Sequence, residues 1–185
     1  MFSHWIDDRL QLRSLQLTDA NELFALTDAN RDYLRRWLPW LDRTTTSADT
    51  RNFIRNAIEQ FGDTEGVVAA ICYNNCIAGI IGYNHIDWDN RIGHMGYWLA
   101  SSHQGKGIMT RSCQYMVDYS FATLYLNRIV ICCATGNRRS RAIPERLGFT
   151  HEGTACEAEW LYNRFIDHEV YAMLRSHWQR YEEFL

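Results

Sequence analysis

The stretch with the clearest chemical potential is HQGKGIM at residues 103–109, in which two glycines flank Lys106 and an apolar run follows. Glycine lets a backbone approach a ligand closely and point several N–H groups at one place. A helix beginning near Ile108 would add its partial positive charge, and Lys106 a full one. The stretch therefore suits a pyrophosphate. It matches neither the GxxxxGK[ST] nor the GxGxxG loop, and on its own it also fits an ordinary turn before a helix.

Residue types and spacing disfavour several other chemistries. The six cysteines form no CxxC pair and the seven histidines have no metal-ligand spacing, so no metal is expected. The formal net charge of −3 disfavours a general nucleic-acid binder. The charged N-terminus is unlike a signal peptide, and no run approaches the roughly 20 apolar residues of a membrane span. We expect a cytoplasmic protein with reduced thiols and no nucleic-acid polymer or membrane as partner, in which Cys132 and Cys133 belong to a core strand.

Hydrophobic periodicity predicts a mixed chain of strands and helices. A first strand, two short helical pieces and a longer helix precede three antiparallel strands. A helix follows the glycine loop, then a strand, a further helix and a final strand pair. The predicted strands are 9–13, 67–73, 76–84, 91–99, 127–134, 152–160 and 165–173, with turns at Asn74-Asn75 and Asn163-Arg164. The predicted helices include 30–38, 48–61 with Ser47 as N-cap, the one that opens at Ile108, and 138–147.

At this point the sequence resembles a known family. Gln104–Met109 resembles the [Q/R]xxGx[G/A] acetyl-CoA loop of the GNAT N-acetyltransferases, although Met109 departs from the usual small last residue. The wider strings GYWLASSHQGKGIMT and GNRRSRAIPERLGFTHEG are similar to the RimJ/RimL branch, as is the AEWL that contains Glu159. The resemblance implies one GNAT-type domain over 1–185, of α/β (α+β) class, with a central mixed, mostly antiparallel sheet flanked by helices.

The resemblance also implies how acetyl-CoA, the cosubstrate, would be held. Backbone N–H groups of the loop would cradle the pyrophosphate, and the strand that ends at Leu99 would pair with the pantetheine arm. A backbone N–H near Leu99 would polarise the acetyl oxygen, and Asn137 would bond the arm. The implied cofactor-binding residues are Trp98, Leu99, Gln104, Gly105, Lys106, Gly107, Ile108, Met109 and Asn137.

Two residues are the implied catalytic candidates. Glu159 aligns with a family glutamate and is the candidate general base, directly or through a water, while a solvated strand carboxylate is the alternative. Glu157 would share its face if the segment is a strand. Ser140 is the candidate general acid toward the CoA sulfur, and it could equally serve as a helix cap. Weaker candidates are Tyr97 and Tyr162 as acids, and His85 and His94 near the acceptor.

The acceptor is less determined. RimL-like enzymes acetylate the α-amine of a protein's N-terminal residue, and relatives linked to self-immunity and antibiotic resistance acetylate an aminoacyl-nucleotide such as processed microcin C. A planar acceptor would stack on aromatic side chains, and Trp37, Trp40 and Phe53 are the candidates for substrate binding. The branch often forms dimers, so a homodimer is conceivable. Rival functions are a non-catalytic acyl-CoA sensor on the same fold and a pyrophosphate or nucleotide binder that does not use CoA.

Overall fold

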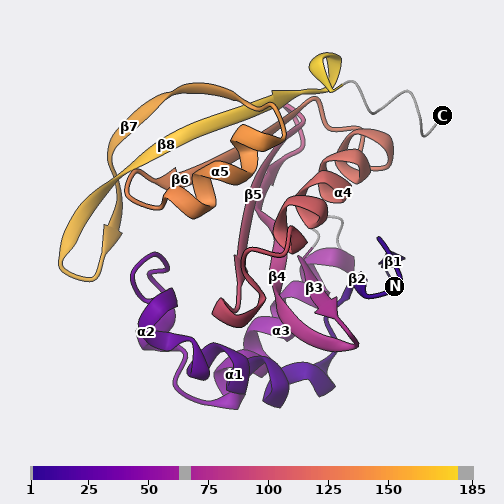
Figure 1. Ribbon diagram of the computed structural model, residues 1–185, viewed down its shortest axis with the longest axis vertical. Helices are drawn as coiled ribbons and strands as arrows, with labels where there is room; N and C mark the ends of the chain where they lie inside the picture. The colour runs from indigo at the N-terminus through magenta and orange to yellow at the C-terminus, as the bar shows by residue number, and fades with distance from the viewer. Residues whose placement is uncertain (1, 63–67, 179–185) are drawn as a thin grey trace. The chain divides into compact units, whose positions relative to one another are not determined.

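The computed structural model describes residues 2–62 and 68–178 of the 185-residue chain. The described strands are hydrogen-bonded in the order β1-β2-β3-β4-β5-β6-β8-β7. β5 and β6 pair in parallel, whereas β3 with β4 and β6 with β8 pair antiparallel. This mixed, mostly antiparallel sheet with helices confirms the predicted fold class (Figure 1). The chain divides into two compact units, Met1–Gly82 with Tyr97–Ile108 and Tyr83–Gly96 with Met109–Leu185.

The first unit contains a small antiparallel ladder and three helices. Leu10 and Leu12 of β2 are fully buried, and β2 pairs with the buried β3. Asn74 and Asn75 both have positive φ, as the tight turn between β3 and β4 requires. The elements of this part are β1 Ser3–Trp5, β2 Leu10–Ser14, α1 Ala20–Ala29, α2 Arg31–Leu34, α3 Ser47–Gly62, β3 Val68–Tyr73 and the start of β4 Cys76–Asp87.

Helices α1 and α3 pack against each other and enclose a core with the ladder (Figure 1). Ile54 and Ala57 of α3 belong to this core, but Phe53 and Ile58 are 44% and 42% exposed, so only half of the predicted apolar face is buried. The N-terminus of α3 also differs from expectation. Thr46, rather than Ser47, accepts the Asp49 N–H, and the Asp49 carboxylate accepts the Thr46 N–H, which together form a capping box.

The second unit is built on the parallel pair and the long C-terminal hairpin. The helix after the glycine loop buries the predicted apolar face, including Met116, Val117 and Phe121. Gly148, with φ +76°, ends the following helix as predicted. The elements are β5 Ile92–Leu99, α4 Ile108–Ala122, β6 Arg128–Ala134, α5 Arg138–Arg146, β7 Thr150–Leu161 and β8 Arg164–Leu174.

Four details differ from the predictions. The helix expected over 30–38 is only α2, because turns replace it before Pro39. The short strand β1 was not expected. The last hairpin turns at Tyr162 and Asn163, with Tyr162 at φ 58°, rather than at Asn163-Arg164. Cys133 is buried as predicted, but Cys132 is exposed, so the core prediction for Cys132 is wrong.

Candidate active site

The glycine loop has the backbone conformation that its sequence predicts. Gly105 and Gly107 have φ +74° and +70°, which strain any residue with a Cβ. A Cβ at either position would meet no atom within 4 Å, so the requirement for glycine is conformational rather than steric. The loop ends where α4 begins, and the first N–H groups of a helix have no partner within it. Left-handed residues that alternate with Lys106 suit an anion-binding nest.

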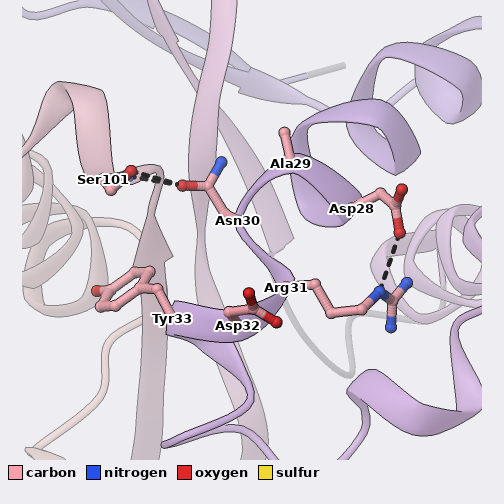
Figure 2. Close-up of a pocket in the computed structure, with 7 residues that line it drawn as sticks. All are labelled: Asp28, Ala29, Asn30, Arg31, Asp32, Tyr33 and Ser101. Atoms are coloured by element: carbon pink, nitrogen blue, oxygen red, sulfur yellow. Dashed lines mark hydrogen bonds and ion pairs between the residues drawn. The ribbon is translucent and has the colours of Figure 1, made fainter.

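The start of the loop is fastened by residues that lie far away in the sequence. Asn30 accepts hydrogen bonds from the backbone N–H and the hydroxyl of Ser101, both at 2.9 Å, through its Oδ1 (Figure 2). Gln104 donates to the Tyr33 hydroxyl at 2.6 Å. A cavity of about 370 Å³ lies here, and its lining is largely polar: Asp28, Ala29, Asn30, Arg31, Asp32, Tyr33 and Ser101. Asn30 and Tyr33 are therefore functional candidates that the sequence did not single out.

The hydrogen bond to Tyr33 changes what Gln104 can contribute to a pyrophosphate site. Its backbone N–H donates to the Ser101 carbonyl at 3.3 Å, and its side chain is used by Tyr33. The predicted cradle for a pyrophosphate is therefore narrowed to the N–H groups that follow Gln104, from Gly105 onward. Gln104 itself acts as a support of the loop.

The end of β5 leads into the loop through a close backbone contact. Leu99 is buried, and the Ala100 N–H donates to the Ala78 carbonyl at 2.8 Å. A Cβ on Gly79 would lie 2.2 Å from the Trp98 carbonyl oxygen, so only glycine fits at this position of β4. The Trp98 side chain packs against the core of the first unit. The Trp98 side chain thus has a structural role, in addition to the role in cofactor binding that was predicted for its backbone.

Within the second unit, the parallel ladder between β5 and β6 is short. It registers Ile92–Met95 with Arg128–Ile131, although β6 continues to Ala134. Gly96 follows the last registered residue of β5, and a Cβ there would lie 2.8 Å from the Asn84 side chain. A strand whose ladder ends before the strand does is suited to accept an extended ligand as a substitute strand.

Asn137 and Ser140 lie together at the start of α5. Asn137 is the N-cap of the helix, and its Oδ1 accepts the Ser140 N–H at 3.3 Å. The Asn137 side chain, which was expected to bond the cofactor arm, therefore serves the helix in this structure. The Ser140 hydroxyl lies 3.2 Å from the Cys133 thiol of β6. Ser140 is thus held by both helix and strand, in a half-buried position.

Glu159 lies on β7 beside a histidine that was not predicted as its neighbour. Its Oε2 is 3.5 Å from His168 Nε2 on β8, and the two side chains are 29% and 19% exposed. Glu157 does not share this face as expected. It has φ 48° within a bulge, and its N–H donates to the Asp167 carboxylate at 2.8 Å. The bulge breaks the strand alternation, so the prediction for Glu157 is wrong.

A second polar group of the second unit fixes α5 to β8. Glu169 accepts hydrogen bonds from His151 and Thr154, at 2.5 and 3.0 Å, and Arg141 lies 3.9 Å away. These contacts, led by the His151 hydrogen bond, hold the pKa of Glu169 below its ordinary value. Arg141 also donates to the Tyr171 hydroxyl at 3.1 Å. This network, which sequence spacing does not reveal, positions the helix that carries Ser140.

The aromatic candidates for the acceptor all belong to the first unit. Phe53 projects from α3 and is exposed, whereas Trp37 and Trp40 are half-buried. Among the residues that the structure describes, no ring contact joins any two of these three. The segment that contains Trp37 and Trp40 is stabilised by Arg35. This arginine donates to the Asp42 carboxylate at 2.7 and 2.8 Å and thereby lowers the pKa of Asp42.

The remaining candidates are more weakly supported. His85 and His94 lie with ring centroids 6.2 Å apart, and both are exposed. Partial burial of the imidazole has the largest effect on the pKa of His94 and lowers it, and the charge of His85 lowers it further. Over residues 2–62 and 68–178, no group of three or more His, Cys, Asp or Glu side chains could hold a metal ion. Within the same ranges, no helix is both long and apolar enough to cross a membrane.

Comparison with known proteins identifies the family of this chain. Residues 9–150 match the acetyltransferase (GNAT) domain family. A putative ribosomal N-acetyltransferase of Bacillus subtilis, YdaF, is 35% identical over 181 residues, which cover 97% of this chain and 98% of the relative.

Among the similar solved structures are two with bound ligands. RimL, a ribosomal L7/L12 α-N-protein acetyltransferase in complex with coenzyme A, is 30% identical with a TM-score of 0.89, over 94% of this chain and 98% of its own. The microcin C7 self-immunity acetyltransferase MccE, in complex with acetyl-CoA and AMP, is 29% identical with a TM-score of 0.87, over 91% and 94% of the two chains. With the family match over most of its length, this chain belongs to the GNAT acetyltransferase family.

Proposed function

We propose that this enzyme transfers the acetyl group of acetyl-CoA directly to an α-amino group, with the N-terminal residue of a protein as the favoured acceptor. The observation that carries the proposal is the loop with Gly105 and Gly107 in left-handed conformation, fastened at its start by Asn30 and Tyr33. The relatives include a putative ribosomal N-acetyltransferase and the ribosomal-protein-serine acetyltransferase of Escherichia coli, which support the choice of acceptor.

The chain's own residues would divide the chemistry as follows. Acetyl-CoA supplies an activated thioester, whose carbonyl carbon is attacked by the neutral amine nitrogen. Glu159 accepts the proton that the amine loses, and His168, 3.5 Å away, holds the carboxylate in place. The backbone N–H near Leu99 stabilises the negative oxygen of the intermediate. The carbon–sulfur bond then breaks, and Ser140 relays a proton from solvent to the departing thiolate, while Glu159 returns its proton to solvent.

Cofactor binding would be shared among backbone groups and side chains. The N–H groups of Gly105, Gly107, Ile108 and Met109 would face the pyrophosphate, with Lys106 adding positive charge. The strand through Trp98 and Leu99 would receive the pantetheine arm. Asn137 would act mainly by capping α5, because its Oδ1 accepts from Ser140.

A second acceptor class is favoured by one exposed side chain. Phe53 is a large hydrophobic residue that is 44% exposed on α3, and a nucleotide base would be a suitable partner for its ring. The self-immunity enzyme MccE was solved with acetyl-CoA and AMP. An aminoacyl-nucleotide acceptor, with Trp37, Trp40 and Phe53 around its base, would make antibiotic resistance the biological role. Either acceptor implies a cytoplasmic enzyme, and a homodimer is part of the proposal.

A panel of acceptors distinguishes these functions. The purified chain is given acetyl-CoA with either short peptides that have an unblocked N-terminus or aminoacyl-adenylate analogues, and release of the CoA thiol is followed. Peptide turnover supports the favoured acceptor, and turnover only of the adenylate analogues supports the second. Binding of acetyl-CoA without turnover of either class would instead identify a non-catalytic acyl-CoA sensor. Light scattering of the same sample tests the homodimer.

A further inference from the structure

Two cations converge on one aromatic ring in the first unit. The Arg9 guanidinium carbon lies 5.8 Å from the centre of the Tyr73 ring, and Lys106 Nζ lies 5.9 Å from it. The His103 ring meets the same tyrosine edge-on, with centroids 6.0 Å apart. Arg9, Tyr73, His103 and Lys106 are called the Tyr73 cluster below. It joins the strand β3, the segment before β2 and the glycine loop.

The cations of the cluster have one carboxylate close by, because Asp7 accepts the Arg9 backbone N–H at 2.7 Å. Over the described residues 2–62 and 68–178, neither Arg9 nor Lys106 forms an ion pair. Both side chains are exposed, while Tyr73 is half-buried. A contact between an exposed cation and an aromatic ring is weak, so the ring orients the two charges without neutralising them. Such a pair of charges suits a dianion.

The third member of the cluster adds a donor rather than a charge. Burial lowers the pKa of His103, and the charge of Lys106 lowers it further. At neutral pH the imidazole is therefore mostly neutral, with one N–H to donate. Its Nδ1 lies 3.0 Å from the Ser102 hydroxyl, which fixes the ring.

The position of Lys106 identifies the anion. It stands between the two left-handed glycines, so the cluster adjoins the loop assigned above to the CoA pyrophosphate. In CoA, the pyrophosphate on the 5′ oxygen and the 3′-phosphate are attached to the same ribose. A phosphate monoester carries a charge of roughly −1.5 to −2 at neutral pH, which matches one arginine and one lysine. Arginine also binds phosphate oxygens in pairs.

We propose that the Tyr73 cluster binds the 3′-phosphate of CoA and thereby makes the protein selective for CoA over 3′-dephospho-CoA. This inference rests on the proposed function, because it takes the loop as the pyrophosphate site. It assigns Arg9, a residue outside the loop, to cofactor selection. Tyr73 is the ring that both cations contact.

The test compares two cofactors that differ by one phosphate. Binding of CoA and of 3′-dephospho-CoA is measured by calorimetry at low ionic strength. We expect wild-type protein to bind dephospho-CoA about tenfold more weakly, since a hydrogen bond to a charged group is worth about one power of ten. Arg9→Gln should weaken CoA by about three- to tenfold and leave dephospho-CoA unchanged. Lys106→Gln should weaken both cofactors, because Lys106 also faces the pyrophosphate, and should weaken CoA by about three- to tenfold more than dephospho-CoA. The preference should shrink as salt is added.

Arg55→Gln is the matched control. Arg55 is an exposed arginine of α3 that bonds Asn52 on its own helix, so this change removes the same charge outside the cluster. It should leave both affinities unchanged. Arg9→Gln also separates the cluster from any disturbance of the loop itself, because Arg9 lies outside the loop.

The outcomes separate this inference from the function on which it rests. Equal affinity of the wild type for both cofactors, or a preference that survives in both variants, would overturn the Tyr73 cluster alone. Failure to bind either cofactor would overturn the cluster together with the assignment of CoA. A preference for CoA without turnover of any amine would uphold the cluster and reject the acetyltransferase.

Discussion

Glu159 lies opposite Ile166 and 3.5 Å from His168 because β7 carries a bulge at Glu157. Ala155 pairs with His168 on one side of the bulge, and Glu159 pairs with Ile166 on the other. An unbroken ladder continued from Ala155 would place Glu157, not Glu159, opposite Ile166. The bulge therefore decides which of two nearby carboxylates stands beside the histidine. Its geometry is fixed by the Asp167 side chain, which accepts the Glu157 N–H.

Glu159→Gln should lower kcat for acetyl transfer by roughly 10²–10⁴-fold, the usual contribution of a general base, and change KM for acetyl-CoA little. Steady-state kinetics with a saturating peptide acceptor measures this. Glu157→Gln is the matched control, since it removes the same charge two residues away, and it should retain most of the activity. Equal losses in both variants would point to strand disruption, and an unchanged rate in Glu159→Gln would remove Glu159 as the base.

Gly105→Ala should weaken acetyl-CoA binding by about tenfold, because a Cβ at φ +74° costs roughly 1–2 kcal/mol. Gly148→Ala is the control, since Gly148 has φ +76° and equally open surroundings but closes α5. It should lower the melting temperature and leave KM for acetyl-CoA unchanged. Cofactor titrations on both variants would contradict the loop assignment if the two glycines behaved alike.

Asn30→Ala should raise KM for acetyl-CoA several-fold, because Ser101 loses both hydrogen bonds that fasten the start of the loop. Each such bond is worth about 1 kcal/mol. Asn30→Asp keeps an acceptor oxygen for Ser101 while it loses the donor to the Leu26 carbonyl. It should therefore retain KM better than the alanine variant. If both substitutions left KM unaltered, Asn30 would support the fold but not the loop.

Glu169→Gln should lower stability at neutral pH, and the difference from the wild type should disappear toward acid pH. The pKa of Glu169 lies below its ordinary value of 4.5 in the folded state, chiefly through the His151 hydrogen bond. The stabilisation is therefore complete above the unfolded-state pKa and is lost as pH falls through the lower folded pKa. Urea unfolding of both proteins between pH 7 and about pH 3 should show a shallower acid decline in the variant. Parallel curves would show that Glu169 is not linked to folding.

The sequence predicted those parts of the site that depend on local backbone chemistry. Gly105 and Gly107 adopt positive φ, and α4 begins at Ile108, because these follow from residue type and neighbouring spacing. The predicted strands were confirmed over the described residues, which do not include Val67, and most helix limits were confirmed for the same reason. Contacts between distant segments are not indicated by residue type or local spacing. Asn30 and Tyr33 reach the loop across 71 positions, which no local pattern encodes.

Irregular strands account for the remaining errors. Glu157 was assumed to alternate regularly, and the bulge defeated that assumption. Cys132 was placed in the core because the run around it is apolar, yet it follows the last residue of β6 that is registered with β5 and is exposed. In both cases the strand continues after its regular pairing with the neighbouring strand has been interrupted. The hydrophobic pattern alone does not indicate where such pairing ends.

The central claim is that this chain moves an acetyl group from acetyl-CoA to an α-amine. Its most direct test is mass spectrometry of a peptide with an unblocked N-terminus and an internal lysine, incubated with enzyme and acetyl-CoA. We predict one added acetyl group on the N-terminal α-amine, matched by one released CoA thiol, and strongly reduced in Glu159→Gln. The account would be contradicted by acetylation confined to the lysine, or by no acetylation of peptides and aminoacyl-adenylate analogues above the rate without enzyme.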